Sequence, residues 1–224
     1  PGWRKEGPPR LYWTQRQAQR RGGQLGERGH QMIVRHAMRY GNPSVASVLD
    51  AMKAEGATRI LVVPLYPQYS GATSASTSDA VALWSLQARR LPEFRHVMRY
   101  HDDPGYIGAL AESVLRQWKA NGRGEKLVMS FHGMPARTLH LGDPYHCECH
   151  VTARLLAERL GLGRDDWMIT FQSRFGRAKW LEPYTEPTVK QLAAKGMKNI
   201  DVICPGFAVD CLETLEEIAM RGRD

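Results

Sequence analysis

The sequence predicts an α/β fold in which parallel sheets are flanked by helices. Short apolar runs of the kind that form strands alternate along the chain with segments whose apolar residues recur at helical spacing. Glycines and prolines separate many of these segments, where the chain must turn. Of the 224 residues, 42% are hydrophobic and 24% charged, which is typical of a globular protein with a sizeable core. Regular alternation of strands and helices favours parallel pairing with helices on both faces of the sheet.

In the first half, a basic amphipathic helix precedes three strands that alternate with three helices. We place this basic helix at residues 11–21 and interpret its arginines as a solvated face, which is commoner than a nucleic-acid patch. The glycine-rich residues 22–26 do not follow a strand, so they lack the context of a dinucleotide-binding turn. The strands are expected at residues 31–37, 59–65 and 94–100, and the helices at residues 42–55, 76–90 and 104–120.

The second half continues the alternation. Residues 121–124 contain two glycines and are expected to form a hinge. The strands are expected at residues 126–131, 167–171 and 199–204, and the helices at residues 151–160, at residues 186–195 and from residue 210.

The net charge and the cysteine content indicate which kinds of partner, metal site and compartment to expect. The net charge of +8 favours anionic partners, namely nucleic acid, acidic lipid or carboxylate-bearing small molecules, without choosing among them. No apolar run approaches the roughly 18 residues of a membrane span, and no signal-peptide pattern is present. The four cysteines form no C-x-x-C pair, which argues against a zinc ribbon or a thioredoxin-type site. A reducing cytoplasm is the expected compartment.

Candidate site residues lie where strands end, because ligands of open parallel sheets bind outside the carboxyl ends of the strands. Four segments qualify: residues 65–73, 131–133, 170–176 and 204–217. In the second of them, His132 ends a buried run, and Gly133 then turns the chain. An imidazole there can exchange a proton near neutral pH, and the alternative is a histidine that only hydrogen-bonds a neighbouring loop.

Three carboxylates stand out in the last segment. Asp210, Glu213 and Glu217 are spaced i, i+3, i+7, so a helix would place them on one face, where they suit a divalent metal or proton transfer. The alternative is that Asp210 caps the helix and Glu213 completes a capping box, which leaves Glu217 unexplained.

Residues 140–150 are rich in histidine and cysteine. Their C-x-C-H spacing matches no standard zinc pattern, and we place them in a loop that enters a helix. The stretch therefore favours adventitious metal binding over a dedicated site. Taken alone, Trp180 and Phe207 are interpreted as core residues, which is the commoner role of such aromatics.

Four motifs in the right order resemble the ferrochelatase family, whose members insert ferrous iron into a porphyrin in the last step of haem synthesis. They are residues 65–70, 130–135, 170–176 and 205–217, within a resemblance that runs from about residue 13 to residue 219. The resemblance implies two Rossmann-like lobes with the porphyrin cleft between them. Two lobes need roughly 300 residues. We therefore expect a chain incomplete at both ends, with a partial first lobe at residues 1–120 and the second lobe at residues 121–224.

The resemblance also assigns residues to roles. His132 matches the essential histidine of the family and Glu213 the glutamate that faces it, so both are expected to be catalytic. Asp210 and Glu217 match neighbouring acidic positions, which makes them candidate metal ligands together with His132 and Glu213. The expected porphyrin-cleft residues are Tyr66, Trp180 and Phe207.

Cofactor and partner expectations follow from the same resemblance. Gly71 occupies the position where some members carry a cluster-ligating cysteine, so no iron–sulfur cluster is expected, nor any cofactor beyond the substrate Fe²⁺. The expected partners are a porphyrin and ferrous iron, and not nucleic acid. The basic surface would suit porphyrin propionates and the face of an anionic membrane, so we expect a cytoplasmic protein with membrane-peripheral association as an option.

The expected chemistry removes two pyrrole protons and brings a dehydrated divalent ion into a planar ligand. Histidine can accept a proton, carboxylates can relay protons or loosen the water shell of the metal, and an aromatic cleft can hold a bent ring. Which of His132 and Glu213 faces the metal stays open. The default substrate is protoporphyrin, with coproporphyrin undecided. The alternatives are a cobalt or nickel chelatase for another tetrapyrrole, a non-catalytic porphyrin or haem carrier and, from the basic helix, a nucleic-acid module.

Overall fold

The computed structural model describes residues 7–223, and the chain divides into two compact units. Of the described residues, the first unit contains 7–65, 71–98 and 209–212. The second contains residues 66–70, 99–208 and 213–223. The predicted lobes divide at a different place, residue 120, because residues 99–120 pack with the second unit.

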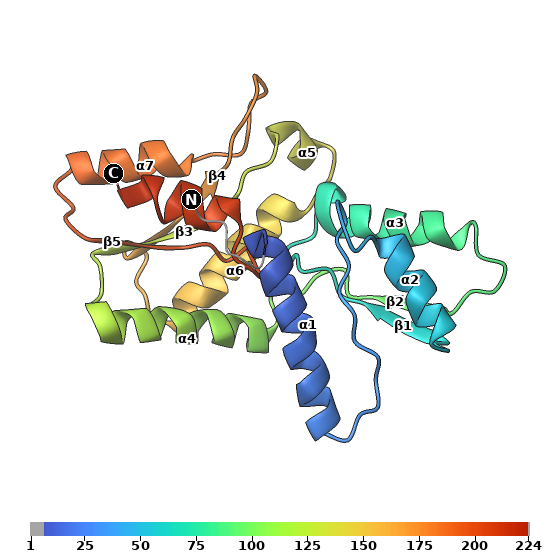
Figure 1. The fold of residues 1–224 in the computed structure, drawn as a ribbon. Coiled ribbons are helices and arrows are strands. Elements are labelled where there is room, and N and C mark those ends of the chain that lie inside the picture. Colours follow the sequence, from blue (N-terminus) through green and yellow to red (C-terminus); the bar gives the residue numbers. More distant parts are fainter. Residues whose placement is uncertain (1–6, 224) are drawn as a thin grey trace. The chain divides into compact units, whose positions relative to one another are not determined.

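The first unit contains a two-stranded parallel sheet, and two of its helices share a core with the sheet (Figure 1). Its elements are α1 (Pro9–Glu27), α2 (Val45–Ala54), β1 (Arg59–Val62), a π-helical turn η1 (Gly71–Ala75), α3 (Ser76–Ser85) and β2 (Glu93–His96). β1 and β2 pair in register from Arg59 opposite Glu93 onward. A small core forms where Leu49 of α2 and Trp84 of α3 pack with Ile60 of β1.

Three sequence predictions for this unit are wrong. Residues 31–37 have no regular secondary structure and pair with no strand of the described chain, and an apolar run without a ladder partner is not a strand. The run 59–65 gives a strand of four residues that is not fully buried, since Leu61 on the face opposite Ile60 is 55% exposed. Residues 22–26 lie inside α1, because glycine disfavours a helix without forbidding it.

The second unit is a three-layer arrangement around a three-stranded parallel sheet in the order β4-β3-β5 (Figure 1). Its elements are α4 (Pro104–Asn121), β3 (Lys126–His132), α5 (Ala136–His140), α6 (Tyr145–Arg159), β4 (Trp167–Gln172), α7 (Thr185–Ala194), β5 (Ile200–Ile203), a π-helix η2 (Glu213–Ile218) and a short 3₁₀ turn η3 (Arg221–Arg223). The central strand β3 pairs with β4 along its length up to His132 opposite Gln172.

Both faces of this sheet are covered, as expected for a parallel sheet. Phe131 and Met129 point to one face, where α4 and α6 supply Val114 and Leu156 to the core. On the other face the hydroxyl of Ser130 lies 2.8 Å from that of Thr185 in α7. The predicted α/β class with parallel sheets and flanking helices is confirmed.

Two helices of this unit begin elsewhere than predicted. α6 begins at Tyr145 instead of residue 151, so residues 145–150 of the histidine- and cysteine-rich stretch are helical and not a loop. The Asp143 carboxylate accepts a hydrogen bond from the Tyr145 N–H at 3.0 Å and so satisfies a first-turn amide that the helix leaves unpaired. The helix predicted from residue 210 is the π-helix η2, which begins at Glu213. No helix within residues 7–223 is long and apolar enough to cross a membrane.

Candidate functional site

His132 ends β3, and its imidazole is held in one orientation. Its Nδ1 lies 2.6 Å from the carbonyl oxygen of Gly133, and a carbonyl only accepts, so Nδ1 carries the proton. In the neutral ring, Nε2 then carries the lone pair. The Tyr145 hydroxyl donates to the main-chain oxygen of His132 at 2.9 Å, and burial raises the pKa of that hydroxyl, which keeps it a donor.

Two aromatic side chains flank the imidazole. The ring centroids of Trp180 and Phe207 lie 6.4 Å and 6.2 Å from that of His132. Trp180 is buried, as its interpretation as a core residue predicts, and Phe207 is half-buried. Phe175 packs edge-on against Trp180 and is 73% exposed. The histidine therefore sits among aromatic rings, of which the outermost faces solvent.

Gly133 is required by a close approach of two chain segments. Its N–H donates to the Gln172 carbonyl at 2.7 Å. A Cβ at Gly133 would lie 2.8 Å from that oxygen and 2.9 Å from the Trp180 ring, which is closer than real Cβ atoms come. The residue after the histidine thus lets β3, β4 and the tryptophan meet.

A polar network extends from Gln172 to η2. The Gln172 amide donates to the Glu213 carbonyl at 2.9 Å and lies 3.4 Å from the Glu217 carboxylate. Ser173 donates twice to that carboxylate, from its N–H at 2.7 Å and from its hydroxyl at 2.5 Å. Ser173 has φ +63°, a conformation that is costly for a residue with a Cβ and that recurs at functional sites.

The prediction that Asp210, Glu213 and Glu217 share one face of an α-helix is wrong. Asp210 precedes η2 and is exposed, so it is not on a common helix face with the two glutamates. In η2 the hydrogen bonds run i→i+5, as from the Ala219 N–H to the Thr214 carbonyl, and the wider turn keeps Glu213 and Glu217 near one side. π-helical turns recur at functional sites.

Polar side chains of the segment after β1 form hydrogen bonds with other residues of the second unit. Buried Gln68 donates to the Thr152 hydroxyl at 2.9 Å, and the Ser70 hydroxyl donates to Asp143 at 2.9 Å. Tyr66, the predicted cleft residue of this segment, is half-buried in the same unit as His132. Gln68 and Ser70 thus anchor the segment by hydrogen bonds, and the role of Tyr66 in a cleft stays a prediction.

Glu148 of α6 is a buried acid that sequence reasoning missed. Its carboxylate accepts from the Tyr69 N–H at 2.7 Å and from Arg99 at 2.7 Å, and its side chain is 5% exposed. The His101 Nδ1, also buried, lies 3.4 Å from it. The signal was faint, because Glu148 stands between two cysteines of a stretch interpreted as a loop.

Gln172 and Ser173 were also missed as individual residues, although both lie in the motif at residues 170–176. Polar residues at the end of a buried strand could have identified them. Within residues 7–223, no three His, Cys, Asp or Glu side chains are grouped so that they could hold a metal ion. The roles of His132, Glu213, Asp210 and Glu217 toward a metal therefore remain predictions.

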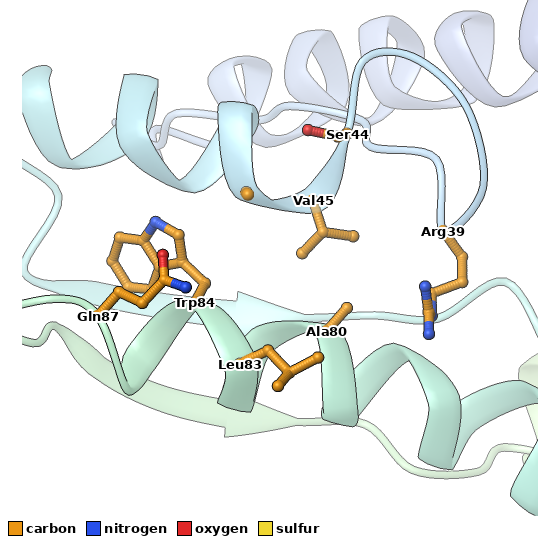
Figure 2. Close-up of a pocket in the computed structure, with 8 residues that line it drawn as sticks. Arg39, Ser44, Val45, Ala80, Leu83, Trp84 and Gln87 are labelled. Carbon is orange, nitrogen blue, oxygen red and sulfur yellow. The ribbon is translucent and has the colours of Figure 1, made fainter.

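A pocket of about 280 Å³ lies elsewhere, in the first unit between α2 and α3 (Figure 2). Val45, Leu83 and Trp84 make it mainly apolar, and its one charged side chain, Arg39, donates to the carbonyl and hydroxyl of Ser76 at 2.8 Å. None of the predicted site residues lines it.

The sequence matches one protein family over nearly its whole length. The family model described as ferrochelatase matches residues 3–224. The chain is 65% identical over 221 residues to a ferrochelatase of a Polaromonas species and 63% identical over 222 residues to one of Methylibium petroleiphilum. In both cases 99% of this chain is covered, but it spans only 60% and 61% of the relatives' length.

Among solved structures, the chain is similar to "SirB from Bacillus subtilis with Fe3+". The TM-score is 0.56 over 84% of this chain and 69% of that one, at 14% sequence identity. At this identity the likeness supports the fold alone.

Proposed function

Because the chain belongs to the ferrochelatase family, we propose that the protein inserts ferrous iron into a porphyrin, protoporphyrin by default, and so forms haem. The observation that carries the proposal is the setting of His132. Its imidazole ends a parallel strand, lies beside the rings of Trp180 and Phe207, and neighbours the Gln172–Glu217 network through strand pairing.

His132 acts as the proton acceptor. Its Nδ1–H is committed to the Gly133 carbonyl, so the basic atom of the neutral ring is Nε2. A pyrrole N–H that approaches Nε2 can lose its proton to the lone pair of that nitrogen. Fixing the ring through Nδ1 also keeps Nε2 aimed in one direction while the proton moves.

Glu213 and Glu217 handle the second proton and the metal. The main chain of Glu213 and the carboxylate of Glu217 are both held by Gln172, and Ser173 adds two donors to Glu217. Carboxylates fixed in this way can replace part of the water shell of ferrous iron. Asp210, an exposed acid just before η2, is the remaining candidate metal ligand of this segment.

Among the proposed cleft residues, half-buried Phe207 and Tyr66 supply apolar surface for the macrocycle, and buried Trp180 packs beside the imidazole. Porphyrin propionates and an anionic membrane surface would both be attracted by the net charge of +8. With Gly71 where some relatives carry a cysteine, the proposal includes no iron–sulfur cluster. We place the protein in the cytoplasm, with peripheral membrane association as an option.

Anaerobic optical titration tests the proposal. The full-length protein and this chain are mixed with protoporphyrin and then with ferrous iron, beside the variants His132→Ala and, as a matched control, His140→Ala in the exposed end of α5. The expected result is conversion of the free-base spectrum to the metalloporphyrin spectrum by the wild type and His140→Ala, but not by His132→Ala.

Two outcomes would contradict the proposal. If the full-length protein binds porphyrin but inserts no metal, the protein is a carrier. If it converts a different tetrapyrrole with cobalt or nickel and leaves protoporphyrin untouched with iron, it is a chelatase of another pathway. Loss of conversion in this chain alone would instead show that the part of the relatives' length that this chain does not span is needed.

A further inference from the structure

α6 carries two imidazoles one helical turn apart in the second unit. His146 and His150 are spaced i, i+4, and their ring centroids lie 4.5 Å apart with the ring planes tilted by 52°. Residues at this spacing are neighbours on a helix surface. The pair exists only because the stretch is helical, and not the loop that its sequence suggested.

One ring of the pair is anchored and the other is open to solvent. The His146 ring stacks on Phe171 of β4 with centroids 5.7 Å apart and planes at 21°, and Phe171 is buried. His146 is half-buried, and His150 is exposed. The anchored ring needs little ordering when a ligand binds, and the exposed ring leaves access from water.

Both imidazoles have a pKa below the ordinary value of histidine, which favours their neutral forms. Burial lowers the pKa of His146, and burial together with the neighbouring His146 lowers the pKa of His150. A neutral imidazole presents one nitrogen lone pair, which is the form that ligates metals. The lowered pKa values therefore reduce the competition between protons and an ion for this pair.

We propose that His146 and His150 together bind a divalent transition-metal ion such as Zn²⁺ or Ni²⁺. Imidazole nitrogens are preferred ligands of these ions, and metal–nitrogen bonds of about 2.0–2.1 Å require two nitrogens to converge within roughly 3 to 4 Å. Centroids 4.5 Å apart put both rings within reach of one ion, once rotation of the exposed His150 ring brings a nitrogen of each ring toward it.

The site uses two protein ligands. No third His, Cys, Asp or Glu side chain in the described part of the chain joins them to form a group of three. The remaining coordination positions are taken by water or by a small exogenous ligand, so the ion binds reversibly and exchanges. The site shares no residue with the proposed insertion site around His132, and its test is independent of that proposal.

Isothermal titration with ZnCl₂ and NiCl₂ at neutral pH tests the inference. The proteins are the wild-type chain, His150→Gln, and two controls, Cys147→Ser for the exposed thiol between the histidines and His132→Ala for the insertion site. His150 is exposed, so its replacement by a helix-compatible amide should preserve the fold, which circular dichroism checks.

We expect His150→Gln to weaken one ion-binding event by about 10- to 100-fold, since losing a ligand costs at least what losing a supporting residue does. Cys147→Ser and His132→Ala should retain that event. In proton NMR, substoichiometric Ni²⁺ should broaden the ring signals of His146 and His150 before those of other histidines. The inference is overturned if His150→Gln binds as the wild type does, or if Cys147→Ser or His132→Ala alone abolishes the event.

Discussion

Removing Arg99 should destabilise the second unit more than neutralising its partner Glu148, although the two form one ion pair of 2.7 Å. The Glu148 side chain is 5% exposed and the Arg99 side chain 50% exposed. Arg99→Ala leaves a buried carboxylate without its cation, whereas Glu148→Gln leaves a cation that water still reaches.

The size of each destabilisation follows from the difference in exposure between Arg99 and Glu148. Breaking a buried pair so that a buried charge stays behind costs about 3–5 kcal/mol, and the half-exposed arginine places Arg99→Ala near the lower end, about 3 kcal/mol. The amide that Glu148→Gln introduces keeps an oxygen for the Tyr69 N–H, so the cost of this change should be about 1 kcal/mol. The double variant should lose much less than the sum of the two, because it leaves no buried charge.

Urea denaturation of the four proteins at neutral pH, followed by tryptophan fluorescence, gives the double-mutant cycle. Trp118 and Trp180 both lie in the second unit and report its unfolding. The reasoning is refuted if Glu148→Gln is the more destabilising single change, or if the two changes are additive within about 0.5 kcal/mol.

Three further predictions concern the same unit. Gly133→Ala should destabilise by about 2 kcal/mol or more, because the methyl group would lie 2.8 Å from a carbonyl oxygen, and a thermal melt indistinguishable from wild type would contradict this. Ser173 has φ +63°, and Ser173→Ala should be about 0.5–1 kcal/mol less stable than Ser173→Gly. Both variants lose the hydroxyl hydrogen bond to Glu217, but only alanine keeps the backbone strain. Equal denaturation midpoints of the two variants would argue against strain. The pKa values of His146 and His150 are lower in the folded protein than the ordinary histidine value of about 6.5, so below that pH the unfolded chain binds more protons than the folded one. The contribution of the two histidines to stability is therefore complete above a pH of about 6.5 and declines as the pH falls. This pH dependence of the free energy of unfolding should become flatter when both histidines are replaced by glutamine.

Local patterns in the sequence determined the fold class and the position of the central histidine. Alternating apolar runs and helical spacings identified β3, β4, β5, α4 and α7 within a few residues, because a buried parallel strand and an amphipathic helix differ in period. His132 could be singled out because a buried run followed by glycine places its last residue at the edge of a sheet. These inferences need only the residues of one element and its immediate neighbours.

Only the tertiary structure decided which groups meet. Nothing in the run 31–37 says whether a partner strand exists, and nothing around Glu148 says that Arg99, 49 residues earlier, lies 2.7 Å from it. Asp210 lies outside the helix that carries the two glutamates, because η2 begins only at Glu213. The π-helical hydrogen bonds of η2 are one residue longer than those of an α-helix, which side-chain spacing cannot reveal. The His146–His150 pair also depends on the tertiary structure, because it requires α6 to begin at Tyr145. Sequence propensity alone leaves this helix start undetermined, whereas the Asp143 hydrogen bond and packing of α6 against the sheet stabilise it.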